Sequence, residues 1–306
     1  MNILLTRMLE QADPGQVAGL ARFFKTGPGQ YGEGDKFLGI KVPVTRAVVK
    51  ECWRKLAPKD RPGAAEAAEA TEAAGSPVFP ELEECIASEY HEVRLAALLA
   101  LVEIFRHAKR CPVAAGHDGA PADTKAVTPD LTGGLQEQCV DFYLSHTGRI
   151  NNWDLVDLSC YPLLGEWLLD RDRSLLYELA RNGKTLWEQR IGIVSTMTFI
   201  RHGQLADTFA IADILLHHPH DLIHKAVGWL LREAGKRDKA ALEAYLQGQE
   251  TPDQVGGDSE IPGSVTTVMP GSDRASLPRY QTMPRTMLRY AIEKFPEPER
   301  LQYLAK

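Results

Sequence analysis

The segment INNWDLVDLS, residues 150–159, places a tryptophan and two carboxylates in one short stretch of chain. Trp153 and Asp157 are four positions apart, so on a helix their side chains lie on the same face. An ionised carboxylate stabilises oxocarbenium charge and orients water, and an indole face attracts a cation. This pair therefore suits a cationic, sugar-centred transition state. The structural alternative is that Asp157 bonds to backbone or to an arginine of a neighbouring helix.

The other aspartate of this segment has a local structural explanation. Asn151 or Asn152 is a good N-cap for a helix, and Asp154 then lies in the first turn, where the helix dipole favours a negative charge. Asp157 follows in an apolar context and has no comparable explanation. Of the two acids, Asp157 is therefore the better candidate for chemistry.

Two further tryptophans lie close to cations in the sequence. Trp187 precedes Arg190 by three residues, and Trp229 follows Lys225 by four. Each tryptophan alone is more typical of a hydrophobic core. Together with Trp153 they give neighbouring helical segments a shared aromatic and charged pattern, which a purely structural role does not require.

Metal chemistry finds little support in the sequence. The run HHPHD contains His217, His218 and His220, which leaves a metal-dependent hydrolase as an alternative, but a turn between helices is the preferred interpretation. The five cysteines are scattered without a C-x-x-C pair, so we expect neither a disulfide framework nor a zinc site.

Residues 23–46, FFKTGPGQYGEGDKFLGIKVPVTR, contain five glycines and two prolines. The segment lacks the G-x-x-x-x-G-K-[ST] pattern and no strand precedes it, so it does not predict a nucleotide-binding loop. We interpret it as a rigid connection that directs Tyr31, Lys25 or Lys36 toward a binding groove.

Most of the chain shows helical periodicity. Apolar residues recur every three or four positions in segments such as EVRLAALLALVEIFRHA, and strand-like alternation is nearly absent, so we predict an all-α fold. Stretches rich in Gly, Pro, Asp, Ser and Thr near 111–134 and 250–280 are expected to be surface loops inserted between helices. Residues 57–77, a Pro and Gly break followed by an Ala/Glu run, fit either a solvated helix or a loop.

The helical segments also repeat. Six of them open with a polar or capping cluster, carry a charged residue near the fourth position and continue into an apolar run. Where no loop-like stretch intervenes, the interval is about 35 residues, a period typical of stacked two-helix repeats. The charged residues are Arg46, Arg94, Asp154, Arg190, Lys225 and Arg285. We predict one helical-repeat domain, residues 1–306, that forms a curved solenoid.

Five of these six charged residues are cations, and a solenoid would align them along one concave face. Such a basic stripe suits a phosphate backbone. Because the formal net charge of the chain is −6, a polyanion partner would need a local concentration of this kind. Two alternatives stay open: the six short alignments are coincidental, or the solenoid binds a protein.

The chain has 306 residues, of which 44% are hydrophobic, and this is enough for a substantial core. No segment approaches about 18 uninterrupted apolar residues, and the N-terminus carries no export signal. We therefore expect a soluble protein without a membrane span. The unpaired cysteines favour a reducing cytoplasm. We also expect a monomer.

Five blocks carry a resemblance to a known family: residues 23–46, INNWDLVDLS, LWEQRIGIVSTMTFIRHG, HDLIHKAVGWLLREAGKRD and MPRTMLRYAIEKFP. In this order they resemble the AlkD-like DNA glycosylases, the DNA alkylation repair family of helical-repeat proteins. The resemblance implies stacked HEAT-like repeats whose concave, positive face holds duplex DNA. It also implies hydrolysis of the N-glycosidic bond of cationic alkylpurines such as 3-methyladenine and 7-methylguanine.

The resemblance assigns roles to residues as well. It implies that Asp157 is the catalytic carboxylate and that Trp153 and Trp229 are aromatic walls that contact the deoxyribose. It further implies that the lesion is not flipped into a pocket, unlike in most glycosylases. The residues expected to bind DNA are Arg190, Tyr31, Lys225, Arg46, Arg94 and Arg285.

A cationic leaving base needs little general-acid help, so one carboxylate suffices and we expect no cofactor. The expected partner is double-stranded DNA with alkylated bases, which would bring a cytoplasmic protein to the nucleoid. The two long loops depart from the compact family pattern and leave partner binding and lesion range open. The alternative function is a non-catalytic helical scaffold that binds DNA or a protein.

Overall fold

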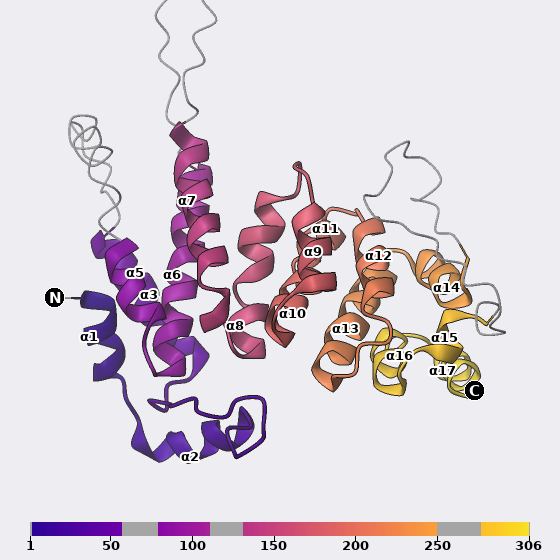
Figure 1. Ribbon diagram of the computed structural model, residues 1–306, viewed down its shortest axis with the longest axis horizontal. Helices are drawn as coiled ribbons and strands as arrows, with labels where there is room; N and C mark the ends of the chain where they lie inside the picture. The colour runs from indigo at the N-terminus through magenta and orange to yellow at the C-terminus, as the bar shows by residue number, and fades with distance from the viewer. Residues whose placement is uncertain (1, 57–78, 111–130, 250–276, 306) are drawn as a thin grey trace, which may run out of the picture. The chain divides into compact units, whose positions relative to one another are not determined.

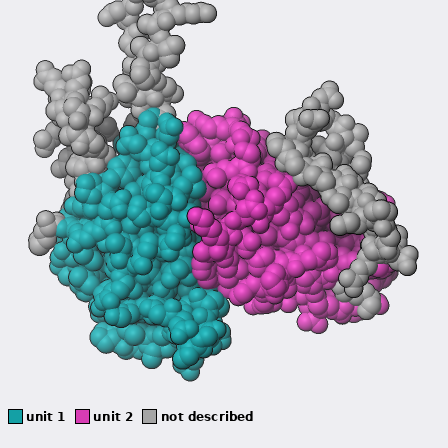
Figure 2. Space-filling model, viewed as in Figure 1, with its two compact units in different colours: residues 1–159 teal, residues 160–306 magenta. Residues whose placement is uncertain are grey.

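The computed structural model describes residues 2–56, 79–110, 131–249 and 277–305. The chain divides into two compact units, Met1–Ser159 and Cys160–Lys306, drawn in teal and magenta in Figure 2. Within the described ranges every regular element is a helix, and β-type pairing is limited to an isolated parallel bridge between Lys36 and Tyr90. The predicted all-α fold is confirmed, whereas the single domain and the curved solenoid stay predictions.

The first unit is built around the long helix α6. Its described elements are α1 (Ile3–Glu10), α2 (Pro14–Phe23), α3 (Val42–Leu56), α5 (Phe79–Ile86), α6 (His91–Arg110), α7 (Leu131–Ser145), the 3-10 helix η1 (Thr147–Arg149) and α8 (Trp153–Asp157). Helix α6 packs against α3, α5 and α7 (Figure 1). Leu95, Leu98 and Leu101 recur at helical spacing and are fully buried, so α6 forms the centre of this core.

The second unit is centred on α13. Its described elements are the π-helix η2 (Tyr161–Gly165), α9 (Ser174–Asn182), α10 (Leu186–Val194), α11 (Met197–Arg201), α12 (Ala206–Ile214), α13 (Asp221–Arg237), α14 (Lys239–Gln247), α15 (Arg279–Thr282), α16 (Arg285–Ala291) and α17 (Glu297–Leu304). Helix α13 packs against α10, α14 and α16 (Figure 1). Ile223, Val227 and Leu230 form its fully buried face.

The six segments aligned in the sequence lie at the starts of six different helices, α3, α6, α8, α10, α13 and α16. Each of the six segments is therefore helical as predicted, and their arrangement as stacked repeats stays a prediction. The six charged residues are not equivalent, because Arg46 and Arg285 are exposed whereas Arg94 and Arg190 are only 2% and 5% exposed. The prediction of an exposed stripe of five cations is therefore wrong for Arg94 and Arg190. Their guanidinium groups form hydrogen bonds to atoms inside their own units.

Residues 57–77, which fit either a helix or a loop, lie outside the described ranges, as do residues 111–130 and 250–276 of the two expected loops. Two boundaries are corrected: residues 131–134 form the start of α7, and Arg279–Thr282 forms α15. Helix α7 packs against α6, and this contact offsets the cost of two glycines near its start. None of the helices in the described ranges has the length and apolar composition that a membrane crossing requires.

Candidate active site

The start of α8 is fixed by its cap. Asn152 has an extended backbone (φ −151°, ψ 159°), and its side-chain oxygen accepts a hydrogen bond of 2.9 Å from the Trp153 amide. Asn152 is therefore the N-cap of α8, and of the two candidates predicted from the sequence, Asn151 and Asn152, the second is correct. Asn151 has another role, because its amide nitrogen donates to Asp35 at 2.8 Å and its oxygen accepts from Arg94 at 3.0 Å.

Asp154 has the structural role expected of it. It lies in the first turn of α8, and its Oδ1 accepts a hydrogen bond from the Leu155 amide at 2.9 Å. Its Oδ2 lies 2.9 Å from Nε2 of His91, and both side chains are almost completely buried. This contact joins α8 to the first residue of α6, a link that the sequence alone did not indicate.

His91 is held between two carboxylates. Its Nδ1 lies 3.2 Å from Oδ2 of Asp35, opposite the contact with Asp154. Oδ1 of Asp35 accepts a hydrogen bond of 2.7 Å from Nη2 of Arg94, and Nη1 of Arg94 donates to the Ser88 carbonyl at 3.0 Å. Arg94 was expected to contact DNA, but here it completes a buried network of two acids and two bases, so we assign it to the scaffold.

The network holds His91 as a cation. Burial by itself lowers the pKa of His91, but its hydrogen bonds to Asp154 and Asp35 raise that pKa to about 9. Burial would raise the pKa of Asp35, but the hydrogen bond to His91 and the charge of Arg94 hold it below its usual value. At neutral pH the network therefore contains two cations that balance two carboxylates.

Aromatic rings link the same network to Trp153. The Phe24 ring stacks on Trp153 with centroids 5.5 Å apart, and it also lies 4.6 Å from the His91 ring. The Phe37 ring stacks on Phe24, with centroids 5.3 Å apart, and on His91, with centroids 4.9 Å apart. Phe23 meets Trp153 edge-on at 5.8 Å. The backbone of Trp153 belongs to α8, and its indole packs against Phe23 and Phe24 of the glycine-rich segment.

The glycine-rich segment is anchored to α6 by one carboxylate. Glu92 is 2% exposed and accepts hydrogen bonds from the amides of Leu38, Gly39 and Ile40, at 3.0, 2.9 and 3.0 Å. Gly39 has φ 88°, and a Cβ there would lie 1.9 Å from the Asp13 carbonyl oxygen, so only glycine fits. These contacts agree with the interpretation of a rigid connection. They position Phe24 and Phe37, which the sequence analysis did not single out.

Three polar side chains of this segment, those of Lys36, Lys25 and Tyr31, are the ones predicted to face a binding groove. Lys36 forms an ion pair of 2.7 Å with Glu89. Lys25 is exposed and has a left-handed backbone (φ 56°), and Tyr31 is half-buried. A DNA contact by Tyr31 stays a prediction.

Asp157 is the last residue of α8 and is half-buried, as is Trp153. The two side chains belong to one five-residue helix, which confirms the predicted helical spacing. Asp154 is 3% exposed and already paired with His91, so the two acids of this helix occupy different environments. Asp157 is the one that retains access to solvent.

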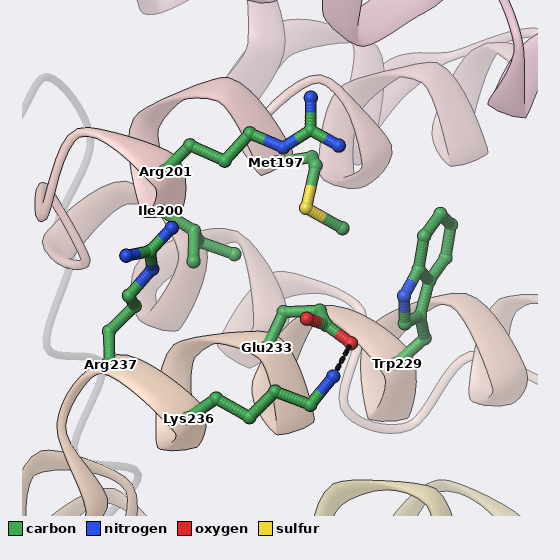
Figure 3. Close-up of a pocket in the computed structure, with 7 residues that line it drawn as sticks. All are labelled: Met197, Ile200, Arg201, Trp229, Glu233, Lys236 and Arg237. Atoms are coloured by element: carbon green, nitrogen blue, oxygen red, sulfur yellow. Dashed lines mark hydrogen bonds and ion pairs between the residues drawn. The ribbon is translucent and has the colours of Figure 1, made fainter.

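The tryptophans and the arginine that were predicted to lie beside Trp153 and Asp157 belong to the second unit. Trp229, on α13, is half-buried and lines a pocket of about 400 Å³ within that unit (Figure 3). Arg190, on α10, donates from Nη1 to the Leu222 carbonyl at 2.6 Å, at the start of α13. Arg190 therefore ties α10 to α13, and Trp187 beside it is 8% exposed and belongs to the core.

The remaining predicted cations differ in their surroundings. Arg46 on α3 and Arg285 on α16 are exposed. Lys225 on α13 has a side chain 41% exposed and forms an ion pair of 2.7 Å with Asp221, one turn before it. These three side chains can reach solvent and a polyanion, in contrast to Arg94 and Arg190.

The histidine run forms a turn between α12 and α13, as preferred from the sequence. His220 caps α13, because its Nδ1 accepts a hydrogen bond of 3.1 Å from the Leu222 amide. His218 Nε2 lies 2.9 Å from Oε1 of Gln189. Among the described residues there is no group of three or more His, Cys, Asp or Glu side chains that could hold a metal ion.

Comparison with known proteins identifies the relatives of this chain. The family model described as DNA alkylation repair enzyme matches residues 4–295. The chain belongs to this family. Among solved structures it is similar to a predicted DNA alkylation repair enzyme from Enterococcus faecalis, with a TM-score of 0.57 and 12% sequence identity over 94% of this chain and 98% of that one. That likeness supports the fold, and no curated protein sequence matches the chain.

Within this member of the DNA alkylation repair family, the residues that sequence analysis missed are those that hold α8 in place. His91 and Asp35 are far from Asp154 in the sequence, and neither belongs to a motif that would pair it with Asp154. The available signal was the start of α6, because His91, Glu92 and Arg94 are polar and directly precede the apolar run LAALLALV, so they need partners when that run is buried.

Proposed function

We propose that this protein is a monofunctional DNA glycosylase that hydrolyses the N-glycosidic bond of cationic alkylated purines in duplex DNA. The observation that carries the proposal is the contrast within α8. Asp154 is buried against His91, whereas Asp157, on the same helix face as Trp153, remains half-exposed. In a DNA alkylation repair enzyme, a solvent-accessible carboxylate beside an indole fits a reaction that develops positive charge on a sugar.

The substrate supplies much of the driving force. A purine alkylated at N3 or N7 carries a positive charge, and it becomes neutral when the glycosidic bond breaks and the bonding electron pair leaves with the base. The C1′ atom of the deoxyribose then carries the positive charge. Protonation of the leaving base is therefore unnecessary, and a single carboxylate is enough.

Asp157 is proposed to act on the sugar. Its carboxylate stabilises the developing oxocarbenium ion and orients the water that adds to C1′, whose released proton passes to Asp157 or to solvent. Trp153 is proposed to present its ring to the deoxyribose, and Phe24 and the cap at Asn152 hold that ring in place. Trp229 of the second unit is proposed as the second aromatic wall. Reaction on the DNA without flipping the base into a pocket is part of the same proposal.

The DNA surface is proposed to use the cations that reach solvent. Arg46, Lys225 and Arg285 are candidates for backbone contacts, together with Tyr31. Arg94 and Arg190 are left out of this surface, because both are buried and bond within their units.

The direct test is to incubate the full chain with methylated duplex DNA and to measure free 3-methyladenine and 7-methylguanine by chromatography. The proposal predicts release well above the spontaneous rate. If the protein binds this DNA but releases no base, it is a scaffold, which is the alternative function.

A further inference from the structure

The turn between α12 and α13 (Figure 1) is built on two histidine side chains. Nδ1 of His218 accepts a hydrogen bond of 3.0 Å from the His220 amide, and Nδ1 of His220 accepts one of 3.1 Å from the Leu222 amide. Each imidazole therefore bonds to the backbone two residues ahead, as Asn and Asp side chains do in turns. The second of these bonds is the N-cap of α13.

Both bonds require a neutral imidazole. A backbone amide can only donate, so Nδ1 of each ring must present its lone pair and the ring proton must be on Nε2. For His218 the same tautomer is favoured from the other side, because its Nε2 lies 2.9 Å from Oε1 of Gln189 on α10, an oxygen that accepts. Protonation of either ring places a hydrogen on Nδ1, where it meets the amide hydrogen. The hydrogen bond is then replaced by a repulsion between two donors.

A histidine cap differs from the other caps of this chain. Among the described helices, the other identified side-chain caps are oxygens of Asn, Asp or Thr, which accept a hydrogen bond at every pH above about 4. These caps are Asn2, Asp13, Asn152, Thr185 and Asp238. Helix α13 therefore begins at a cap whose ability to accept a hydrogen bond changes near neutral pH.

The charges on α13 itself mostly oppose protonation of the two rings. Burial lowers the pKa of His220; the carboxylate of Asp221 acts against this, and His224 and Lys225 lower that pKa further. Burial also lowers the pKa of His218, as do the neighbouring His220 and His224. The positive end of the α13 dipole acts in the same direction.

The helices packed against this turn do not offer a carboxylate in compensation. Within the described parts of α10, α12 and α13, the acids already have other partners: Glu188 with the Lys184 amide, Asp207 with Arg173, Asp213 with Arg279, and Asp221 with Lys225. Arg190 of α10 bonds to the Leu222 carbonyl in the first turn of α13, and Arg285 of α16 is next to Thr286, which bonds to Asp221. Both cations disfavour a further positive charge at the cap.

We propose that this turn is an acid-sensitive cap, in which the neutral rings of His218 and His220 hold the start of α13 and protonation of either ring releases it. The release begins as the pH falls below 6.5, the ordinary pKa of histidine, because both rings bind their proton more weakly in the folded state. His224 has no part in it, since its Nε2 donates to the His218 carbonyl and that bond survives protonation. The helix that responds carries Trp229, but the inference does not rest on the proposed function.

The experiment measures hydrogen–deuterium exchange of the full chain by mass spectrometry, in peptides that cover residues 220–226. Exchange at about pH 5.5 and about pH 7.5 is corrected for the intrinsic rate of an unstructured amide at each pH. In the wild type we expect protection at the start of α13 to fall about fivefold at the lower pH, the loss typical of a helix without its cap. A double variant, His218→Asn with His220→Asn, keeps both acceptors without a titration in this range, so its protection should be equal at the two pH values.

Two controls isolate the two rings. His202→Gln removes an exposed histidine whose Nδ1 donates to the Thr198 carbonyl, and His224→Gln removes a titration but keeps a donor, so both should retain the loss seen in wild type. Equal wild-type protection at both pH values, or a double variant that responds as wild type does, would overturn the proposal.

A second measurement observes the rings directly. Nitrogen-15 NMR of the imidazoles at about pH 7.5 should show Nδ1 of His218 and His220 without a proton, and a proton found there would also overturn the proposal. No DNA enters any of these measurements, so a protein that shows the acid-sensitive cap but releases no base would contradict the proposed function and leave this inference intact.

Discussion

Nε2 of His91 lies 2.9 Å from Oδ2 of Asp154, and this buried contact joins the first residue of α6 to the first turn of α8. The same imidazole contacts Asp35 from its other nitrogen and lies against Phe24, which stacks on Trp153. One cation therefore positions α8 in two ways, directly through the carboxylate of Asp154 and indirectly through Phe24, which stacks on Trp153. Both proposed groups of the first unit, Asp157 and Trp153, depend on it.

Removing one charge from this contact should destabilise the protein. Asp154→Asn keeps the shape of the side chain but leaves His91 with a single carboxylate, so we expect the free energy of unfolding to fall by about 3 kcal/mol. Urea unfolding followed by circular dichroism measures this change. The matched control is Asp141→Asn on the exposed side of α7, which should change stability by less than about 0.5 kcal/mol. Equal effects of the two substitutions would show that the contact does not hold α8.

Stability should also fall as the pH rises above neutral. The pKa of His91 is raised from 6.5 to about 9 in the folded protein, so the folded state binds its proton more tightly than the unfolded state. The resulting stabilisation is complete below about pH 6.5 and disappears as the pH rises through about 9. Buried Cys85 and Cys139, whose pKa is raised from 9.0 to about 12, act mainly above this range.

The measurement compares urea unfolding at about pH 6 and about pH 8.5. We expect a loss of about 2 kcal/mol across this interval, in proportion to the pKa difference of His91 between the two states. The variant His91→Gln should be less stable than wild type at the lower pH and should lose no stability as the pH rises across this interval, because the lowered pKa values of His218 and His220 make stability rise with pH. A wild-type protein equally stable at both pH values would contradict the assignment of His91 as the titrating cation.

The sequence predicted the helix at α8 and separated its two aspartates, because capping, the helix dipole and spacing are local properties of consecutive residues. It did not predict the partner of Asp154, because His91 is far away in the chain and pairs with it only through tertiary packing. The same limit explains why the sequence wrongly placed Arg94 and Arg190 on a DNA-binding surface. A cation near the start of a helix looks alike in sequence whether it points to solvent or bonds to a carbonyl inside the unit.

The glycine-rich segment offers a test of its rigidity. Gly39→Ala places a Cβ 1.9 Å from the Asp13 carbonyl oxygen and keeps a backbone at φ 88°, so we expect a loss of about 3 kcal/mol or more. Gly29→Ala is the matched control, since φ is 72° there but no atom lies within 4 Å of the added Cβ. It should cost about 1 kcal/mol. Thermal unfolding of both variants measures the difference, and similar losses would show that the close approach to Asp13 is unimportant.

The aromatic wall predicts a specific loss of rate. Trp153→Ala removes the ring that is proposed to face the sugar cation, which should slow base release about 5- to 30-fold, equivalent to about 1 to 2 kcal/mol of lost stabilisation. Trp153→Phe should lose less, because a ring remains. Single-turnover release of 7-methylguanine measures both rates. If Trp153→Ala weakened DNA binding but left the rate at saturating protein unchanged, the ring would be a binding group without a role in the reaction.

The role of Asp157 is tested most directly by the single-turnover rate of base release from methylated duplex DNA by Asp157→Asn, measured with protein in excess. We expect a rate at least about 100-fold below wild type, because the sugar cation loses its stabilising charge, with DNA affinity changed by less than about threefold. Asp141→Asn serves as the control and should match wild type. A rate for Asp157→Asn equal to that of wild type would contradict the claim that Asp157 carries the reaction.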